Sequence, residues 1–299
     1  MAMDYDFTSC RLCPRECGAD RTKGLGFCGG GLLPKAAKAY LHMWEEPCLS
    51  GTNGAGTVFF SGCSLQCCYC QNYKISAENF GKEISVERLA EIFLEIQDKG
   101  AHCLDLVSPT HYVPQIISAL DITGDKLHIP VVYNCGGYEK IETLKMLDGY
   151  IDIYLPDLKY YSSEASRKYS NAPDYFEKAS AAITEMCRQT GKCEFDDNGI
   201  MQKGVIIRHL TLPTLRMDSV KLLEWAAENL PRDNFRISLM SQYTPFYKSR
   251  EYREISRRIS TFEYNFVLDK AVTLGLEGYM QERSSAKEEY TPEFDLLGI

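Results

Sequence analysis

Three closely spaced cysteines are the feature of this sequence with the clearest chemical meaning. Cys63, Cys67 and Cys70 have the spacing C-x3-C-x2-C and follow a short apolar run. A compact loop with this spacing can place three thiolates around a 4Fe-4S cluster, which normally takes four cysteines. Three ligands leave one iron open, much as a catalytic zinc keeps an open position. An open iron can bind a chelating small molecule and pass it an electron.

Cys68 directly follows Cys67, so the loop offers a second set of spacings. We assign the ligand role to Cys67, because its spacing to the other two cysteines is one with an established three-ligand use. Cys68 is therefore expected to stay outside the cluster. The alternative for the whole group is a zinc knuckle or a set of buried thiols without a metal, which the position after a predicted strand disfavours.

A second group of cysteines lies near the N-terminus. Cys10, Cys13, Cys17 and Cys28 place four thiols within a short stretch that is rich in glycine. Four soft ligands at short range suit either zinc or an iron–sulfur cluster. Zinc would be structural, whereas an iron–sulfur cluster could relay electrons. The sequence leaves both open, with ordinary unligated thiols as the third possibility.

Short β-rich runs alternate with helical patterns over the middle of the chain. Strands are expected at residues 56–60, 103–107, 129–133, 151–155, 204–208 and 235–240. Helices are expected over 85–99, which Ser85 would cap and Gly100 would end, and around 141–147 and 220–226. This alternation predicts right-handed βαβ units and a parallel sheet. Six such units favour an α/β fold with a partial parallel (β/α)6-type barrel over a flat doubly wound sheet.

In such a barrel the chemistry takes place at the carboxyl ends of the strands. Polar residues gather where each predicted strand stops, so one active site is expected there. Asp157 and Lys159 are two residues apart and would point the same way if the strand continues. They could hold a ribose or the substrate backbone, or form an ion pair that closes the barrel. His111 and His209 are candidate proton donors or substrate contacts, with a structural role as the equal alternative.

Composition restricts the class of protein. The chain has 299 residues, of which 44% are hydrophobic and 25% are charged, which is ordinary for a globular protein and excludes collagen-like or low-complexity chains. The net charge of −8 disfavours a broad phosphate-binding face, so no nucleic-acid partner is expected. No apolar run approaches the roughly 18 residues of a membrane span, so no membrane partner is expected.

Thirteen cysteines indicate metal binding in a reducing compartment. The first residues lack the features of a secretory signal, and the protein is expected in the cytoplasm, where thiols stay reduced. There, tight cysteine clusters indicate metal ligation and not disulfides. We expect a Cys-rich metal-binding extension over 1–54, the barrel over 55–280 and a charged tail over 281–299.

The cysteine loop, with the aromatic Tyr69 before its last cysteine, resembles the signature of radical S-adenosylmethionine (SAM) enzymes. The resemblance implies that the amino and carboxylate groups of SAM chelate the open iron. Reduction then cleaves the sulfonium to methionine and a 5′-deoxyadenosyl radical, which abstracts a hydrogen atom. In this scheme the cofactor supplies the difficult chemistry, and the protein supplies orientation, a dry cavity and an electron path.

Other motifs are most similar to those of the glycyl-radical-enzyme activases. The stretch 157–159 resembles the aspartate–leucine–lysine motif of pyruvate formate-lyase activating enzyme, and 133–137 is similar to a strand-end Asn-Gly turn beside the methionine group. Arg208 matches a family arginine that could clamp the methionine carboxylate; a structural salt bridge is the alternative. Residues 45–47 and 279–282 complete the resemblance to an activase-related branch.

The resemblance implies roles for individual residues. SAM contacts are expected from Tyr69, Ser108, Thr110, His111, Asn134, Gly136, Asp157 and Arg208. Catalytic roles are expected for Asp157, Lys159, Arg208 and His209. The implied partners are a flavodoxin- or ferredoxin-type electron donor and, as a protein substrate, a glycyl radical enzyme.

Two departures leave the substrate open. The Gly-Gly-Glu-Pro stretch of the family appears here as residues 108–111, so contact with the amino group must come from other atoms, such as the Ser108 and Thr110 hydroxyls. Thr214 stands where a glycine is expected. The alternatives are a radical SAM enzyme that modifies a small molecule or RNA, and a non-catalytic iron–sulfur protein that relays electrons. Release of 5′-deoxyadenosine would separate the enzymes from the relay protein.

Overall fold

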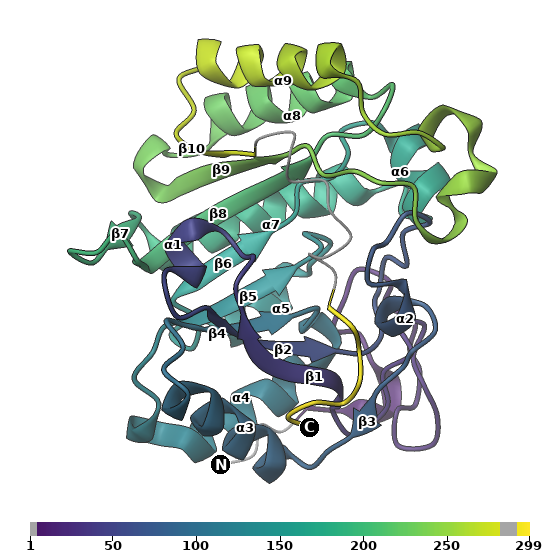
Figure 1. The fold of residues 1–299 in the computed structure, drawn as a ribbon. Coiled ribbons are helices and arrows are strands. Elements are labelled where there is room, and N and C mark those ends of the chain that lie inside the picture. Colours follow the sequence, from purple (N-terminus) through teal and green to yellow (C-terminus); the bar gives the residue numbers. More distant parts are fainter. Residues whose placement is uncertain (1–4, 282–291) are drawn as a thin grey trace.

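The computed structural model describes residues 5–281 and 292–299, and shows helices packed against one large β-sheet (Figure 1). The strands are β1 Lys35–His42, β2 Ala55–Phe60, β3 Lys82–Glu83, β4 Leu104–Val107, β5 Val131–Cys135, β6 Ile153–Pro156, β7 Glu194–Phe195, β8 Met201–Leu210, β9 Phe235–Met240 and β10 Gly278–Met280. The α-helices are α1 Pro47–Ser50, α2 Tyr73–Ser76, α3 Val86–Asp98, α4 Val113–Thr123, α5 Ile141–Met146, α6 Ser163–Ser170, α7 Tyr175–Thr190, α8 Arg216–Asn229 and α9 Thr261–Thr273. Short 3-10 helices are η1 Phe7–Ser9, η2 Thr110–Tyr112, η3 Gly124–Lys126, η4 Arg232–Asn234, η5 Tyr247–Glu251 and η6 Arg253–Ile255.

The sheet follows the chain order. Among the described residues the strand order is β10-β9-β8-β6-β5-β4-β2-β1-β3, and β7 forms a hairpin with β8. From β2 to β10 every pair along this path is parallel, whereas β1 pairs antiparallel with β2 and with β3. Each right-handed crossover moves to the next strand on the same side, which places the connecting helices on one face. The predicted α/β fold with a mostly parallel sheet is confirmed.

Helix α3 illustrates how the sequence sets these elements. The hydroxyl of Ser85 accepts a hydrogen bond from the Arg88 backbone N–H at 3.1 Å and caps the helix, as predicted. Gly100, with φ of +85°, lets the chain reverse after the last turn. The buried face packs against α4 and the sheet. All six predicted strands are present, as β2, β4, β5, β6, β8 and β9.

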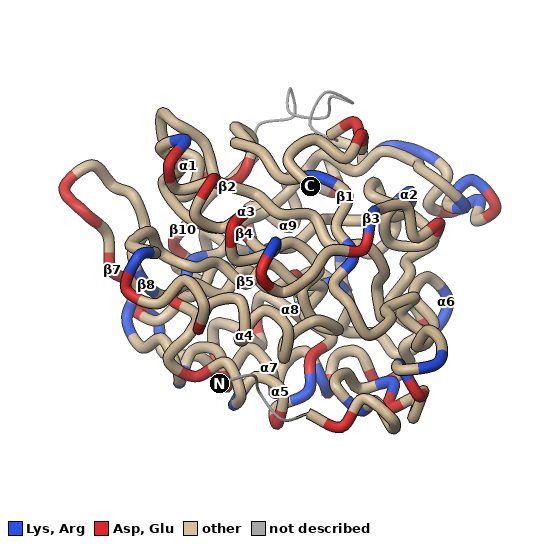
Figure 2. Tube along the Cα trace, turned by 90° about the horizontal axis from the view of Figure 1, so that it is seen from below, with Lys and Arg blue, Asp and Glu red and all other residues tan. Residues whose placement is uncertain are grey.

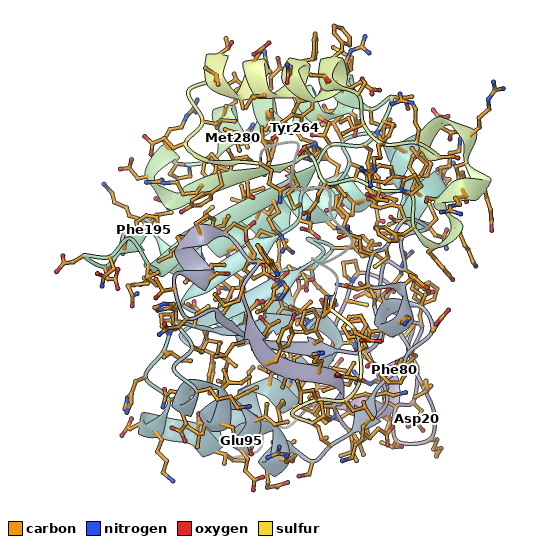
Figure 3. All side chains as sticks on the ribbon, viewed as in Figure 1. Asp20, Phe80, Glu95, Phe195, Tyr264 and Met280 are labelled. Carbon is orange, nitrogen blue, oxygen red and sulfur yellow. The ribbon has the colours of Figure 1, made fainter. Side chains whose placement is uncertain are left out.

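The central strands are buried on both faces. Every residue of β2, β4, β5 and β6 is buried, as expected for parallel strands covered by helices. Figure 3 shows side chains filling the space between the sheet and the helices, whereas Phe195 on β7 lies at the side of the molecule. No described helix has the length and apolar character needed to cross a bilayer. Acidic and basic residues are interspersed along the described chain (Figure 2).

Strand β1 and the last described residues pack together at one edge of the sheet. Strand β1 lies within the region expected as an N-terminal extension, yet it joins the sheet beside β2. Residues 292–299 run along β1, where the Ala39 N–H donates to the Leu297 carbonyl at 2.8 Å and Phe294 packs on Phe59. The charged part of the expected tail, residues 282–291, lies outside the described residues. The proposed domain boundaries therefore stay a prediction.

Candidate functional site

The carboxyl ends of the parallel strands bring the predicted site residues to one edge of the sheet. The loop with Cys63, Cys67 and Cys70 follows β2, and Ser108 follows β4. Asn134 lies near the end of β5, Asp157 directly after β6 and Arg208 near the end of β8. Because neighbouring parallel strands end at the same edge, these side chains from distant parts of the sequence come together.

The three cysteines of the loop face internal space, and each sulfur accepts a hydrogen bond. Cys67 and Cys70 line a cavity of about 190 Å³ together with Asp157, Lys159 and Arg208; we call it the cluster-side cavity. Ser170 donates to the Cys67 sulfur at 2.9 Å, Ser76 to Cys70 at 3.3 Å and the Leu65 N–H to Cys63 at 3.4 Å. Such hydrogen bonds stabilise thiolates that bind iron.

Cys68 differs from its neighbours in the loop. Its backbone N–H donates to the Tyr169 carbonyl at 2.8 Å, and its side chain is as buried as that of Cys67. Cys68 does not line the cluster-side cavity, whereas Cys67 does. This placement supports the ligand assignment made from the spacing, which stays a prediction.

The arrangement of thiols suits a cluster better than a single ion. Within residues 5–281 and 292–299, no three His, Cys, Asp or Glu side chains are close enough to share one metal ion. A 4Fe-4S cluster makes no such demand, because each thiolate binds a different iron and the sulfurs stand apart. Cys67 and Cys70 line the cluster-side cavity and Cys63 lines a separate small one, and this set of three thiols fits a cluster with one iron left open to a ligand.

Tyr69 connects the loop to the wall of the barrel. The Tyr160 hydroxyl donates to the Tyr69 hydroxyl at 2.7 Å, and the Ser170 hydroxyl, 2.8 Å from Tyr160, donates to Cys67. Tyr69 is buried, and its ring packs edge-on against Tyr243. The aromatic position of the motif thus belongs to a group of hydroxyls packed beside the Cys67 sulfur.

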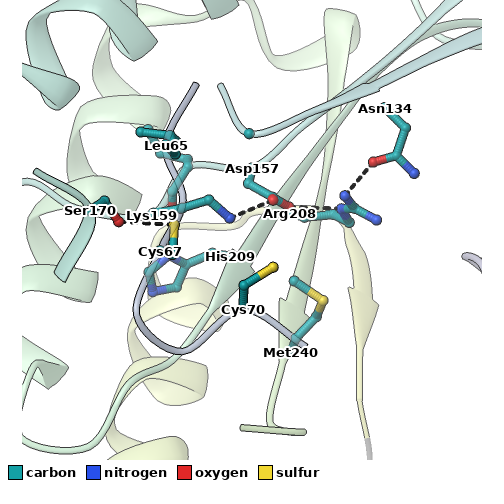
Figure 4. A network of polar contacts seen from close by, with 12 residues as sticks. Leu65, Cys67, Cys70, Asn134, Asp157, Lys159, Ser170, Arg208, His209 and Met240 are labelled. Atoms are coloured by element: carbon teal, nitrogen blue, oxygen red, sulfur yellow. Dashed lines mark hydrogen bonds and ion pairs between the residues drawn. The ribbon is translucent and has the colours of Figure 1, made fainter. Parts of the chain in front are cut away.

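A buried charged network lies beside the cysteines (Figure 4). Lys159 Nζ donates to Asp157 Oδ2 at 2.6 Å, and Arg208 Nε donates to Asp157 Oδ1 at 2.9 Å. Arg208 Nη2 donates to Asn134 Oδ1 at 2.5 Å, and Nη1 reaches Glu45 at 3.4 Å. Although burial raises the pKa of the Asp157 carboxyl, the charges of Arg208 and Lys159 outweigh this effect and hold it below its usual value. Asp157 is therefore an anion that orients two cations.

The stretch after β4 lies on the Cys63 side of the loop. Ser108 has φ of +58°, and with Thr110 and His111 it lines a small cavity next to Cys63. The Thr110 hydroxyl donates to Glu139 at 2.8 Å, so it is already engaged. Gly136 lines the same cavity. His111 Nε2 lies 2.8 Å from the Ser61 carbonyl, and burial lowers the pKa of His111 to about 4, so His111 is neutral at physiological pH.

His209 does not join the charged network. Its Nδ1 lies 2.6 Å from the Leu158 carbonyl and its Nε2 lies 2.8 Å from the Ser219 hydroxyl. Adjacent residues of a strand point to opposite faces, so His209 faces away from the cavity that Arg208 lines. Burial lowers the pKa of His209 to about 4. The structure thus supports the structural alternative for His209 and gives no support to the predicted catalytic role.

The N-terminal cysteines pack against the cluster loop. Cys10, Cys13 and Cys28 are buried and Cys17 is exposed. A Cβ atom at Gly26 would lie 3.5 Å from the Cys28 sulfur and 3.7 Å from the Cys17 sulfur, so these two sulfurs flank one glycine. The buried guanidinium of Arg21 donates to the carbonyls of Gly31 and His111 and to the Cys10 sulfur, which ties this segment to the barrel.

Three buried carboxylates near the site were not predicted from the sequence. Glu45 bonds to Arg208, and Glu46 lies next to it with only 8% of its surface exposed. Asp105 sits inside β4, where Asn134 and Thr57 donate to it at 3.4 and 3.3 Å, and burial raises its pKa well above the usual value. Asp105 could have been found in the sequence, because it is an acidic residue within an otherwise apolar predicted strand.

Comparison with known proteins gives one family and a small set of structural neighbours. The model of the radical SAM superfamily matches residues 57–226. The uncharacterized protein MJ0674 of Methanocaldococcus jannaschii is 30% identical over 285 residues, which cover 91% of this chain and 76% of that protein. Streptococcus suis SuiB bound to the precursor peptide SuiA matches with a TM-score of 0.50 at 14% identity, over 73% of this chain and 46% of SuiB. A radical SAM methyltransferase from Sphaerobacter thermophilus matches with a TM-score of 0.51 at 11% identity, over 76% of this chain and 66% of that one. These two structures support the fold alone, and this chain spans less than two thirds of the length of either.

Proposed function

This chain belongs to the radical SAM superfamily, and from that premise we propose that it cleaves SAM reductively and takes a hydrogen atom from a substrate. Membership of the family implies a 4Fe-4S cluster and SAM as cofactors. The cluster and SAM would supply one-electron chemistry: an electron from a flavodoxin- or ferredoxin-type donor would break the sulfonium C–S bond of SAM, which gives methionine and a 5′-deoxyadenosyl radical that becomes 5′-deoxyadenosine on taking the hydrogen. The observation that carries the proposal is that two cysteines of the loop and the Lys159–Asp157–Arg208 network line one cavity.

We assign one group of residues to binding the cluster and another to orienting SAM. We assign the cluster to Cys63, Cys67 and Cys70, whose sulfurs accept hydrogen bonds from within the chain. Asp157 fixes the ammonium of Lys159 and the guanidinium of Arg208 at the cavity wall. These fixed charges can meet the carboxylate and ribose of SAM, because Arg208 keeps further N–H groups besides those that contact Asp157, Asn134 and Glu45. Ser108, Thr110, His111 and Gly136 would close the site on the Cys63 side.

The finer assignment is hydrogen abstraction from a glycine Cα of a partner enzyme. It rests on the similarity of residues 157–159 and 133–137 to the activase motifs. Asp157 and Lys159 form the ion pair that the sequence offered as the alternative, 2.6 Å between Oδ2 and Nζ, so a role at the substrate or the ribose rests on the motif and not on this contact.

A metal at the N-terminal cysteines is a separate proposal. We assign it to Cys10, Cys13, Cys17 and Cys28, whose thiols would have to move closer together to share one zinc ion. Iron and zinc analysis of a Cys10/Cys13 double alanine variant tests the assignment. Loss of zinc with iron unchanged indicates a zinc site. Loss of part of the iron indicates a second cluster, and unchanged metal content contradicts the proposal.

The main proposal is tested by anaerobic reconstitution followed by dithionite and SAM. The protein is expected to release 5′-deoxyadenosine and methionine. Cys67→Ala should abolish the release, whereas Cys68→Ala should largely preserve it, because only Cys67 lines the cluster-side cavity. No release from a protein with an intact cluster would favour an electron-relay protein. Equal loss in both variants would overturn the ligand assignment.

A further inference from the structure

A second cavity adjoins the cluster-side cavity. It has about the same volume, 190 Å³, and Arg208 and Met240 line both. On its far side it is lined by Trp44, Glu45, Glu46, Ser238 and Tyr279. We call it the acidic cavity. This is many times the roughly 10–15 Å³ that one water needs by the same measure, so the cavity has room for a small polar group on an alkyl stem.

The charges around the acidic cavity do not balance. Lys159 and Arg208 are neutralised by Asp157 and Glu45. Glu46 is left over: it is 8% exposed, and its Oε2 has no hydrogen-bond partner among the described residues. A hydrogen bond with Ser238 stabilises the charged form of Glu46 in part, but burial still raises its pKa. A buried carboxylate with one oxygen unpaired costs free energy unless it is protonated or meets a cation.

The other titratable groups at this cavity do not supply a cation. Burial lowers the pKa of His42 to about 4, so its imidazole is neutral. Burial also raises the pKa of Tyr279, which stays a neutral phenol. Burial raises the pKa of Glu46 to about 7, with Arg208 lowering it and Glu45 raising it. Glu46 is therefore poised to ionise when a positive charge arrives.

We propose that the acidic cavity binds a positively charged group of the substrate, an alkylammonium or a guanidinium, through the carboxylate of Glu46. The cation would sit beyond Arg208, so that the rest of the substrate extends toward the cluster-side cavity. The placement of this group relative to hydrogen abstraction rests on the proposed function, whereas the binding of a cation does not. The inference narrows the substrate to molecules or peptide side chains that carry such a cation.

The test is a titration of the reconstituted protein with small probes. Trp44 lines the acidic cavity and the other tryptophan, Trp225, does not, so fluorescence in a Trp225→Phe background reports occupancy. Ethylguanidinium and butylammonium are expected to give saturable changes. Ethylurea and butyrate, which are neutral and anionic, are expected to give none. Tighter binding of acetyl-Gly-Arg-Gly-amide than of ethylguanidinium would indicate a peptide as the source of the cation, and weaker binding a free small molecule.

Two variants test whether the fluorescence response depends on Glu46. Glu46→Gln should weaken ethylguanidinium binding about tenfold or more, because a hydrogen bond to a charged partner is lost. Glu87→Gln, on the exposed surface of α3, should leave it unchanged. If Glu46→Gln does not fold, the comparison of cationic, neutral and anionic probes on the parent protein still shows whether the acidic cavity selects a cation.

Three results would overturn the inference. The first is equal response to ethylurea and ethylguanidinium, and the second is a response to butyrate alone, which would make Arg208 the anchor. The third is competition between ethylguanidinium and SAM, which would assign the cavity to the cofactor. Release of 5′-deoxyadenosine is measured separately, so failure here leaves the proposed function standing.

Discussion

The backbone carbonyl of Cys28 accepts a hydrogen bond from the backbone N–H of Cys63 at 2.9 Å. The last cysteine of the N-terminal group is thereby joined to the first cysteine of the cluster loop. Gly62 makes this approach possible, because a Cβ atom there would lie 2.4 Å from the Cys28 carbonyl oxygen. The two cysteine groups are therefore expected to depend on each other for their geometry.

Gly62→Ala tests this dependence. The added methyl group would push the two loops apart, so the variant should lose part of its iron on reconstitution and unfold more easily than the parent. Gly124→Ala is the control, because Gly124 also has positive φ but a Cβ atom there would meet no other described atom within 4 Å. The control should lose more than about 1 kcal/mol to backbone strain, because alanine is strained at positive φ, but it should keep its iron. Iron content and thermal unfolding measure both effects, and equal behaviour of the two variants would contradict the coupling.

Asp157→Asn should destabilise the fold as well as weaken SAM binding. The substitution leaves Lys159 and Arg208 as buried cations without their shared anion, which costs about 3 kcal/mol. Asp148→Asn removes an ion pair with Arg188 in which both side chains are about half exposed, and it should cost less than about 1 kcal/mol. Urea unfolding of the three proteins compares these costs. A similarly small loss of unfolding free energy in both variants would show that the Lys159–Asp157–Arg208 network does not stabilise the fold.

Because of Glu139, the free energy of unfolding should fall as the pH rises from about 4.5 to about 7. Burial raises the pKa of Glu139 from 4.5 to about 7, although hydrogen bonds from Thr110 and Tyr133 lower it in part. In this window the folded protein keeps a proton that the unfolded chain has lost, so up to about 3 kcal/mol of unfolding free energy disappears. Glu139→Gln should flatten this part of the profile, and Glu142→Gln, which is exposed on α5, should not. An unchanged slope in Glu139→Gln would mean that another group titrates.

The parallel strands of the core, and the edge of the sheet at which the site lies, could be predicted from the sequence. Buried strands such as β5 and β6 are short and mostly apolar, and a polar site residue lies near the end of β5, Asn134, and directly after β6, Asp157. Helix α4 was not predicted, because it is buried on nearly all sides and so lacks the polar face that marks an amphipathic helix. Strand β1 was missed because it pairs antiparallel outside the βαβ repeat.

Individual side chains were harder to predict than elements. Arg208 and His209 were both placed at the site, although neighbours on a strand face opposite ways, and only Arg208 reaches the cavity. No role was predicted for Glu46 or Asp105 from the sequence. Their burial and their unpaired oxygens depend on residues that are distant in the sequence.

The most direct test of the central claim is the electron paramagnetic resonance spectrum of the reduced cluster with and without SAM. The account holds that three cysteines leave one iron free to bind this ligand, so anaerobically reconstituted and reduced protein should show a 4Fe-4S signal that changes on addition of SAM. A signal that stays the same at saturating SAM would contradict it.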